Sequence, residues 1–336
     1  MHNTTKRIAI NGFGRIGRAA FKIALEQKNI EVVAINDLTD ASILAHLLQY
    51  DTAYGHYRKT VTAAKGMLIV DGQEFPVYAE PDPLKLPWGT LGVDVVLECT
   101  GRFTDKVGAA QHMTAGAKKV ILSAPAKGED DSVPTFLIGV NEDTYADETI
   151  ISNASCTTNS LAPIAKIIHE QFGIAKALMT TIHSYTADQN LQDGPHKDLR
   201  RARAAAQNIV PTTTGAAIAV TEVIPELKGL FDGHSMRVPT IVVSLTDFTF
   251  VLKKKTSVEE INAVLTAATK EARYRTVLSV TSEPLVSSDF IGNPHSSIVD
   301  LALTKVIDGD LVKIVAWYDN EWGYSNRLVE MAEHIA

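Results

Sequence analysis

The segment NGFGRIGR, residues 11–18, restricts the fold more than any other part of this sequence. Its glycines at positions 12, 14 and 17 follow a short apolar run, Lys6–Asn11, and open residues 15–27, where apolar residues recur at helical spacing. Glycines in this pattern allow a tight turn and close approach of a pyrophosphate to the backbone, and the helix N-terminus favours the negative charge. The segment therefore predicts a dinucleotide-binding strand–turn–helix unit.

Asp37 supports the same interpretation, because it lies 20 residues after Gly17, at the end of a second apolar run, residues 31–37. A carboxylate at this place accepts hydrogen bonds from the adenosine ribose and repels a 2′-phosphate, so NAD is favoured over NADP. The alternative is a glycine turn that only packs a helix on a sheet, with Asp37 as a strand-end cap. The strand–glycine–helix context favours the cofactor site.

The order of apolar runs predicts two domains of an α/β chain. Up to residue 155, continuous apolar runs alternate with helical patterns, which indicates a Rossmann-type parallel sheet covered on both faces, with an antiparallel excursion at residues 57–77. After Ser155 the strand candidates are fewer and longer, and the helices are grouped apart. We therefore expect an NAD-binding domain at residues 1–155 and an α+β catalytic domain with a mainly antiparallel sheet at residues 156–320.

Composition narrows the functional classes. The 336 residues carry a net charge of −7, which argues against a nucleic-acid or anionic-membrane partner. Two cysteines cannot build a disulfide framework, and no run of 18 apolar residues occurs, so we expect a cytoplasmic protein. No cluster of His, Cys and Asp has the spacing of a metal site, so no metal is expected.

Cys156, within SNASCTTNS, is the candidate nucleophile, because it stands where a helical pattern begins and a helix N-terminus lowers the pKa of a thiol. His183, in TTIHSYT, ends a predicted strand that follows that helix, so it can return beside the thiol and act as its base. A lone histidine is otherwise more often structural. Cys99, at the end of an apolar strand, is expected to be inert and buried. A thiol, a base and a nicotinamide cofactor together indicate oxidation of an aldehyde through a thioester.

Two segments are candidates for binding anions. PTTTGAA, residues 211–217, places three hydroxyls before a glycine, and HKDLRRAR and HSMRVPT supply Arg201 and Arg237. A solvated basic loop and a salt bridge are the plainer interpretations of the two arginine segments. An RNA-binding loop is also conceivable, but interleaved aromatic residues are missing and the chain is acidic.

With these residues in view, the chain resembles the phosphorylating, NAD-dependent glyceraldehyde-3-phosphate dehydrogenases of bacterial type. The resemblance extends over essentially the whole length and rests on INGFGRIGR, ASCTTN, HSYTADQ, DLRRARAAAQNIVPTTTGAA, MRVPT and WYDNEWGYSNR. It implies glycolytic oxidation and phosphorylation of D-glyceraldehyde 3-phosphate to 1,3-bisphosphoglycerate. It further implies a cytoplasmic homotetramer and a terminal helix, about residues 321–336, that packs back onto the first domain.

The resemblance also implies roles for single residues. Cys156 is the acylated nucleophile and His183 activates it. The residues implied for inorganic phosphate are Ser155, Thr157, Thr214 and Gly215, with Arg201 nearby. Thr186 and Arg237 are implied for the phosphate of the substrate. The residues implied for the dinucleotide are Gly12, Phe13, Gly14, Arg15, Ile16, Asp37, Thr100 and Asn320.

Two other functions remain as alternatives. Erythrose-4-phosphate dehydrogenase is similar and shares the Cys/His pair, but CTTN, PTTTGAA and the basic loop favour an enzyme that also binds inorganic phosphate. A non-catalytic protein, such as an NAD-sensing regulator or an RNA-binding subunit, is expected to have lost the nucleophile or the base, and both are present.

Overall fold

The computed structural model describes residues 5–128 and 133–336. The chain forms two compact units. The first comprises Met1–Phe136, Thr144–Ala154 and Ser325–Ala336, and the second comprises Leu137–Asp143 and Ser155–Tyr324.

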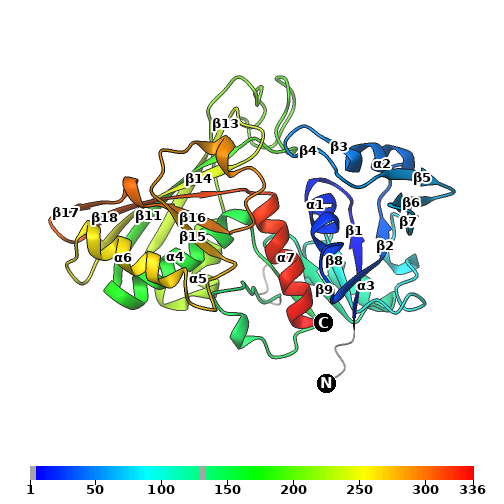
Figure 1. Cartoon of the computed structure of the whole chain (residues 1–336), viewed down its shortest axis with the longest axis horizontal. Helices are drawn as coiled ribbons and strands as arrows, with labels where there is room; N and C mark the ends of the chain where they lie inside the picture. Colours follow the sequence, from blue (N-terminus) through cyan, green and yellow to red (C-terminus); the bar gives the residue numbers. More distant parts are fainter. Residues whose placement is uncertain (1–4, 129–132) are drawn as a thin grey trace. The chain divides into compact units, whose positions relative to one another are not determined.

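The first unit is built on an eight-stranded sheet with the order β10-β9-β8-β1-β2-β7-β6-β5 (Figure 1). All neighbours from β10 to β7 are parallel, and β7, β6 and β5 are antiparallel. The strands are β1 Lys6–Asn11, β2 Ile30–Asn36, β5 Val61–Ala64, β6 Met67–Val70, β7 Gln73–Tyr78, β8 Val95–Glu98, β9 Lys119–Leu122 and β10 Ile150–Ser152. A separate pair is formed by β3 Tyr50–Asp51 and β4 Gly55–His56.

The direction of the winding reverses between β1 and β8. From β1 the chain builds the sheet outward through β2 and β7, and it then returns to the other side of β1 as β8, β9 and β10. The carboxyl ends of parallel strands at such a switch point are where open α/β sheets bind ligands. Strand β8 is buried at all four positions, which explains its uninterrupted apolar sequence.

The helices of this unit are α1 Arg15–Ala24, α2 Ala41–Gln49, α3 Lys106–Thr114 and α7 Trp322–Ile335, which belongs here from Ser325 onward. Asn29 Nδ2 donates to Glu333 Oε1 at 2.9 Å, and Lys119 Nζ donates to the carbonyl of Ile335 at 2.7 Å. These contacts fix the end of the C-terminal helix.

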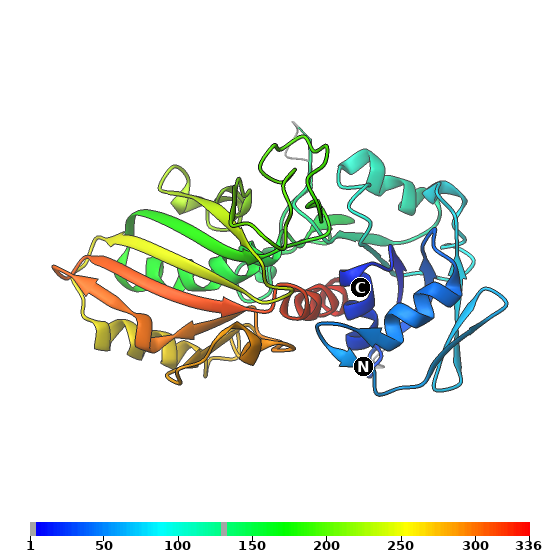
Figure 2. The same ribbon diagram turned by 90° about the horizontal axis from the view of Figure 1, so that it is seen from above.

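The second unit has a sheet with the order β12-β13-β11-β14-β18-β16-β15, and β17 pairs with β18; several of its strands run side by side in Figure 2. The strands are β11 Ile174–Ser184, β12 Val210–Thr212, β13 Phe231–Val238, β14 Ser244–Leu252, β15 Leu278–Thr281, β16 Ser297–Asp300, β17 Lys305–Ile307 and β18 Leu311–Tyr318. Its helices, α4 Cys156–Phe172, α5 Ala216–Val223 and α6 Val258–Ala268, lie together on one face of the sheet (Figure 1). Alternate residues of β14 are buried, as expected for a strand covered on one face.

Short 3-10 helices complete the two units, at Pro83–Lys85, Glu142–Thr144, Pro225–Leu227, Ser287–Phe290 and Leu301–Leu303. The predicted fold class is confirmed: a Rossmann-type parallel sheet and a second, mainly antiparallel sheet. Within the second sheet, β11 and β13 are parallel, as are β15 and β16. Strand β13 was not predicted from the sequence, and it places Arg237 opposite His183.

Candidate active site

The glycine turn in the first unit has a different steric reason for each of its glycines. Gly12 has φ +93°, and a Cβ there would lie 2.8 Å from the carbonyl carbon of Cys99. A Cβ on Gly17 would lie 2.1 Å from the carbonyl oxygen of Gly12, so only glycine lets α1 pack this closely. Around Gly14, the N-cap of α1, a Cβ would meet nothing within 4 Å. The turn is therefore tight at its two ends and open in the middle, where a pyrophosphate needs room.

The open side of the turn faces a cavity of about 290 Å³. Asp37 lies on its wall, and its carboxylate accepts hydrogen bonds from the backbone N–H groups of Phe13 (2.7 Å) and Thr39 (2.9 Å). The cavity is lined by Asn11, Gly12, Gly14, Asn36, Asp37, Leu38, Glu80, Pro81, Cys99, Thr100, Arg102 and Phe103. The structure thus brings Gly12, Gly14, Asp37 and Thr100 to one site, and these residues fit a dinucleotide.

The other predicted dinucleotide residues of this turn, Phe13, Arg15 and Ile16, do not line the cavity. The ring of Phe13 is buried and packs edge-on against Phe21, and its N–H is used by Asp37. The guanidinium of Arg15 pairs with Asp51 at 2.6 Å. Arg15 and Ile16 are the first two residues of α1, so what they present to an anion is the backbone of a helix N-terminus.

In the second unit, Cys156 is the first residue of α4. Ser155 caps this helix, because its hydroxyl accepts the N–H of Thr158 at 3.0 Å. Helix α4 leads through one residue into β11, whose penultimate residue is His183. The chain returns along the helix, so that Sγ of Cys156 lies 3.5 Å from Nε2 of His183. The structure therefore brings together the two residues that the sequence analysis selected.

The hydrogen bonds of His183 determine which ring nitrogen faces the thiol as a base. Nδ1 lies 2.7 Å from the carbonyl oxygen of Ser184, and a carbonyl can only accept, so Nδ1 carries the hydrogen. Nε2 is then an acceptor directed at Cys156. Arg237 Nη1 lies 3.2 Å from the same Nδ1. Because both nitrogens are donors, this approach is a cation beside the ring and not a hydrogen bond.

Burial makes both members of the pair neutral. It lowers the pKa of His183 to about 3, and the positive charge of Arg237 acts in the same direction. Burial also raises the pKa of the Cys156 thiol, against the opposing effects of Arg237 and of the Thr157 hydrogen bonds. The expected lowering by the helix N-terminus is therefore outweighed by desolvation, and the proton has to leave the thiol as it reacts. Cys99 is partly exposed and lines the cavity of the first unit, so the prediction of a buried residue was wrong. Desolvation still raises the pKa of its thiol to about 12, in keeping with an inert thiol.

The site lies where β11, β13 and β18 end and β14 begins. His183 stands opposite Arg237 in the parallel pair β11–β13, and Ser244 stands opposite Tyr318 in the antiparallel pair β14–β18. The register of the β11–β13 pair therefore places Arg237 next to His183, and no local sequence pattern predicts this register.

Tyr318 was missed by the sequence analysis, although it lies within the quoted WYDNEWGYSNR. Its hydroxyl lies 2.9 Å from Oγ1 of Thr157 and 2.8 Å from Oγ1 of Thr181, and its ring contacts His183 edge-on. Burial raises its pKa, so the hydroxyl stays protonated. Tyr318 thereby fixes the first turn of α4 against β11.

The side chain of Asn320 is hydrogen-bonded to Ser184, the residue next to His183. Asn320 Oδ1 accepts hydrogen bonds from the hydroxyls of Ser184 (3.0 Å) and Ser244 (3.2 Å). The orientation of the amide is thus set, with its oxygen toward the sheet. Ser184 was not predicted as a site residue. The only feature of the sequence that could have indicated it is its position directly after His183.

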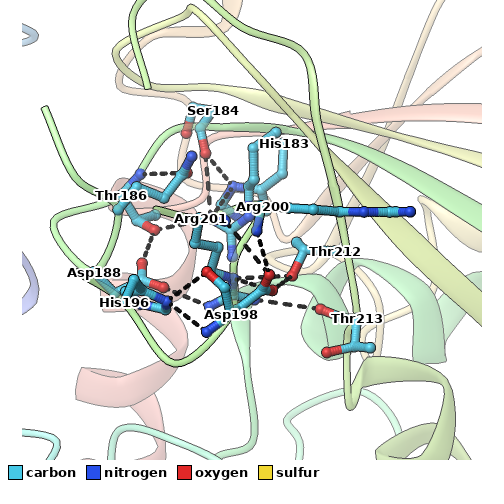
Figure 3. A network of polar contacts seen from close by, with 12 residues as sticks. His183, Ser184, Thr186, Asp188, His196, Asp198, Arg200, Arg201, Thr212 and Thr213 are labelled. Atoms are coloured by element: carbon cyan, nitrogen blue, oxygen red, sulfur yellow. Dashed lines mark hydrogen bonds and ion pairs between the residues drawn. The ribbon is translucent and has the colours of Figure 1, made fainter. Parts of the chain in front are cut away.

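A polar cluster beside His183 contains Arg201, together with Thr186 and Asp188 (Figure 3). The hydrogen bonds of Arg237 join it to the same cluster. Arg237 Nη1 donates to Oγ1 of Thr186 at 2.9 Å and to the carbonyl of Ser184 at 3.3 Å. Arg237 Nε is buried without a hydrogen-bond partner among the described residues. Arg237 as a whole is half-buried, and a planar cation of this kind is suited to a ligand anion.

Arg201 joins this cluster through Asp188, which the sequence analysis did not single out. Its Nη1 lies 2.5 Å from Oδ2 of Asp188, whose carboxylate also accepts the hydroxyl of Thr186. Its Nε donates to Thr212 at 2.9 Å. Most of the Arg201 fork is therefore occupied within the loop, in contrast to Arg237.

The other predicted phosphate residues stand at two helix starts. Ser155 and Thr157 begin α4, where their hydroxyls contact Thr158 and Tyr318. Thr214 and Gly215 begin α5, where the Thr214 hydroxyl accepts the N–H of Ala216 at 3.2 Å. Helices α4 and α5 are in contact. Two N-termini that carry hydroxyls are suited to an anion.

The glycine turn with its cavity is that of an NAD-dependent oxidoreductase, and the cysteine–histidine pair is the candidate catalytic site. Two family models match the chain: the NAD binding domain of glyceraldehyde 3-phosphate dehydrogenase at residues 6–106 and its C-terminal domain at residues 155–320. The chain belongs to the glyceraldehyde-3-phosphate dehydrogenase family.

Individual relatives are similar over nearly their whole length. A glyceraldehyde-3-phosphate dehydrogenase of Geobacillus stearothermophilus is 56% identical over 332 residues, 98% of each chain. One of Thermotoga maritima is 58% identical over 330 residues, 97% of this chain and 98% of the relative. Glyceraldehyde-3-phosphate dehydrogenase 1 of Bacillus subtilis is 54% identical over 332 residues, 98% of each. The resemblance stated from the sequence is confirmed.

No group of three His, Cys, Asp or Glu side chains in residues 5–128 and 133–336 is arranged to hold a metal ion. Of the helices in these same residues, none combines the length and apolar composition that a bilayer crossing requires.

Proposed function

We propose that this chain oxidises D-glyceraldehyde 3-phosphate to 1,3-bisphosphoglycerate, with reduction of NAD and uptake of inorganic phosphate. The observation that carries the proposal is the contact between the Cys156 thiol and Nε2 of His183, at 3.5 Å, with the histidine tautomer fixed by Ser184. A neutral thiol needs a base at this distance in order to attack a carbonyl.

In the first step, Sγ of Cys156 forms a bond to the aldehyde carbon while its proton moves to Nε2 of His183. His183, now protonated, donates a hydrogen bond to the oxyanion of the hemithioacetal and keeps its proton. Bound NAD supplies the acceptor for the hydride that leaves the carbon. The resulting thioester on Cys156 is cleaved by phosphate, whose oxygen bonds to the acyl carbon as the carbon–sulfur bond breaks. His183 then returns its proton to the departing sulfur, which restores the neutral pair.

Two anion sites serve this chemistry. The phosphate of the substrate is bound by Arg237 and Thr186, supported by the contact between Arg237 Nη1 and Oγ1 of Thr186. Inorganic phosphate is bound by Ser155, Thr157, Thr214 and Gly215 at the two helix starts, with Arg201 nearby. NAD is held at the glycine turn by Gly12, Gly14 and the first residues of α1, with Asp37 on the ribose. Thr100 and Asn320 provide further contacts to NAD.

The wider organisation is part of the same proposal. Residues 1–155, with the terminal helix, act as the NAD-binding domain, and residues 156–320 act as the catalytic domain. The protein works as a cytoplasmic homotetramer. Several large apolar side chains of the second unit are exposed, which supports a contact between subunits: Leu178, Leu191, Leu199, Ile209 and Ile218.

The test is the initial rate of NADH formation from NAD and glyceraldehyde 3-phosphate, with and without inorganic phosphate. We expect turnover that requires phosphate. A rate that is indifferent to phosphate, or higher with erythrose 4-phosphate, would move the assignment to erythrose-4-phosphate dehydrogenase.

Arg237→Leu tests the substrate-phosphate site. Charge-assisted hydrogen bonds contribute about 1.5–3 kcal/mol, so we expect kcat/KM for glyceraldehyde 3-phosphate to fall about 10- to 100-fold. Because the charge of Arg237 lowers the pKa of Cys156, alkylation of this thiol by iodoacetamide at pH 7 should also become slower. Arg275→Leu, at an exposed arginine of the same unit, is the matched control. Equal effects of the two substitutions would refute the site.

A further inference from the structure

A buried polar network ties together the carboxyl ends of the strands beneath the cofactor cavity. Asn11 ends β1, Asn36 ends β2 and Glu98 ends β8, and these are adjacent strands at the switch point. The side chains of Glu98 and of its partner His112, on α3, are both 0% exposed. A carboxylate this deep is costly unless every lone pair is used.

Glu98 meets that condition with four donors. Its Oε2 accepts from Asn11 Nδ2 at 2.6 Å and lies 3.1 Å from His112 Nε2. Its Oε1 accepts from the N–H of Thr100 at 2.8 Å and also from the Thr100 hydroxyl. Thr100 therefore reaches the cavity wall with both of its donors anchored on one carboxylate oxygen.

Trp88 fixes the state of His112. The indole Nε1 lies 3.0 Å from Nδ1 of His112, and an indole N–H can only donate, so Nδ1 is an acceptor without a hydrogen. His112 is consequently the neutral tautomer with its hydrogen on Nε2, directed at Glu98. The negative charge of the pair belongs to Glu98.

The network continues to the opposite side of the cavity. Asn11 Oδ1 accepts from Asn36 Nδ2 at 2.7 Å. Asn36 in turn donates to the carbonyl of Glu80 and accepts its N–H, both at 3.0 Å. Asn11, Asn36, Glu80 and Thr100 all line the cavity, whereas Glu98 and His112 do not. The carboxylate thus lies behind the wall and sets the position of residues on it.

We infer that Glu98 is a positioning residue for NAD, which holds Thr100 on one side and the Asn11–Asn36–Glu80 chain on the other in the arrangement that the dinucleotide binds. This inference rests on the proposed binding of NAD at the glycine turn. The donors around Glu98 have fixed directions: Asn11 cannot turn its amide without losing Asn36, and His112 cannot exchange its hydrogen without opposing Trp88. Only a group with two acceptor oxygens satisfies them.

Glu98→Gln tests the inference with almost no change in volume. Glutamine has an NH2 group in place of one carboxylate oxygen, and this group would face two hydrogen-bond donors. The hydrogen bonds either to Thr100 or to Asn11 and His112 must therefore be lost. We expect the dissociation constant for NAD, measured by isothermal titration calorimetry on the full chain, to rise at least about tenfold. The KM for NAD should rise in parallel, while kcat at saturating NAD stays within about threefold, because Cys156 and His183 are untouched.

His112→Phe is the second variant, since it removes one donor to Glu98 from a residue that does not line the cavity. We expect a smaller rise in the same dissociation constant. Val96→Ala, a core truncation in β8 itself, is the control: it should lower the melting temperature and leave NAD binding unchanged.

The outcomes separate the two proposals. Unchanged NAD binding in both Glu98→Gln and His112→Phe would overturn the positioning role, whatever happens to the melting temperature. A rise as large in Val96→Ala as in Glu98→Gln would overturn it too, because general destabilisation would then suffice. A wild-type chain that does not bind NAD would overturn the proposed function as well.

Discussion

Cys156→Ser is expected to reduce the rate of NADH formation by at least about 1,000-fold. The geometry explains a loss of this size. A serine hydroxyl in place of the thiol would still face Nε2 of His183, but its proton is much harder to remove, and burial already opposes ionisation at this position. The acyl-enzyme would then form too slowly to carry turnover.

The measurement is the initial rate with saturating substrate, NAD and phosphate, together with a rapid-mixing experiment for the first turnover. We expect no burst of NADH in the variant, while NAD binding by calorimetry stays as in the wild type. Ser160→Ala is the matched control, because this buried hydroxyl lies one turn further along α4 and contacts Ser297. Retention of more than about a tenth of the wild-type rate in Cys156→Ser would place the nucleophile elsewhere.

The fold was predictable where the determinants are local. The glycine turn, the first strand and helix and Asp37 lie within one short segment, and each has a steric or electrostatic reason that is visible in the sequence. Cys156 and His183 were also within reach, because α4 and β11 are consecutive and a helix followed by a strand returns the chain to its start.

The remaining parts of the site depend on sheet register. Arg237 reaches His183 only because β13 pairs in parallel with β11, and Tyr318 reaches Thr181 from β18, two strands away in the sheet. Glu98 and His112 look like an ordinary strand end and an ordinary helix residue in the sequence. Their partnership, and the role of Trp88 in fixing the histidine, follow from packing between elements that no periodicity reveals.

The helix N-terminus is only one of the influences on the pKa of Cys156. A helix N-terminus does favour a thiolate, and Arg237 adds to this effect. The sequence gives no measure of how dry the site is, and desolvation proves to be the larger influence on both Cys156 and His183. The consequence is a neutral pair, which makes the base more important than it would be beside a preformed thiolate.

His183→Asn is therefore expected to lower kcat by about 100- to 10,000-fold, the range of general acid–base catalysis. Asparagine can keep a donor toward the carbonyl of Ser184, so the local backbone is preserved while the proton acceptor facing Cys156 is lost. NAD binding and the melting temperature near pH 7.5 should change little. A variant that retains more than a tenth of the wild-type kcat would show that another group accepts the proton.

The low pKa of His183 also predicts how the free energy of unfolding depends on pH, and His183→Asn tests this dependence. The folded state holds the pKa of His183 at about 3, through burial and Arg237, whereas an unfolded histidine titrates near 6.5. Above pH 6.5 both states are neutral and nothing is lost. Below it the unfolded state binds the additional proton, so the free energy of unfolding falls by up to about 1.4 kcal/mol per pH unit.

Urea unfolding of the wild type and of His183→Asn between pH 7.5 and about pH 4.5 measures this contribution. We expect the wild type to lose about 2–3 kcal/mol more than the variant over that interval, because asparagine does not titrate. Parallel curves for the two proteins would mean that the folded state accepts the proton near the ordinary pKa of histidine. In that case burial and Arg237 would not hold the pKa of His183 down, and the imidazole would carry a proton in the folded protein below about pH 6.5.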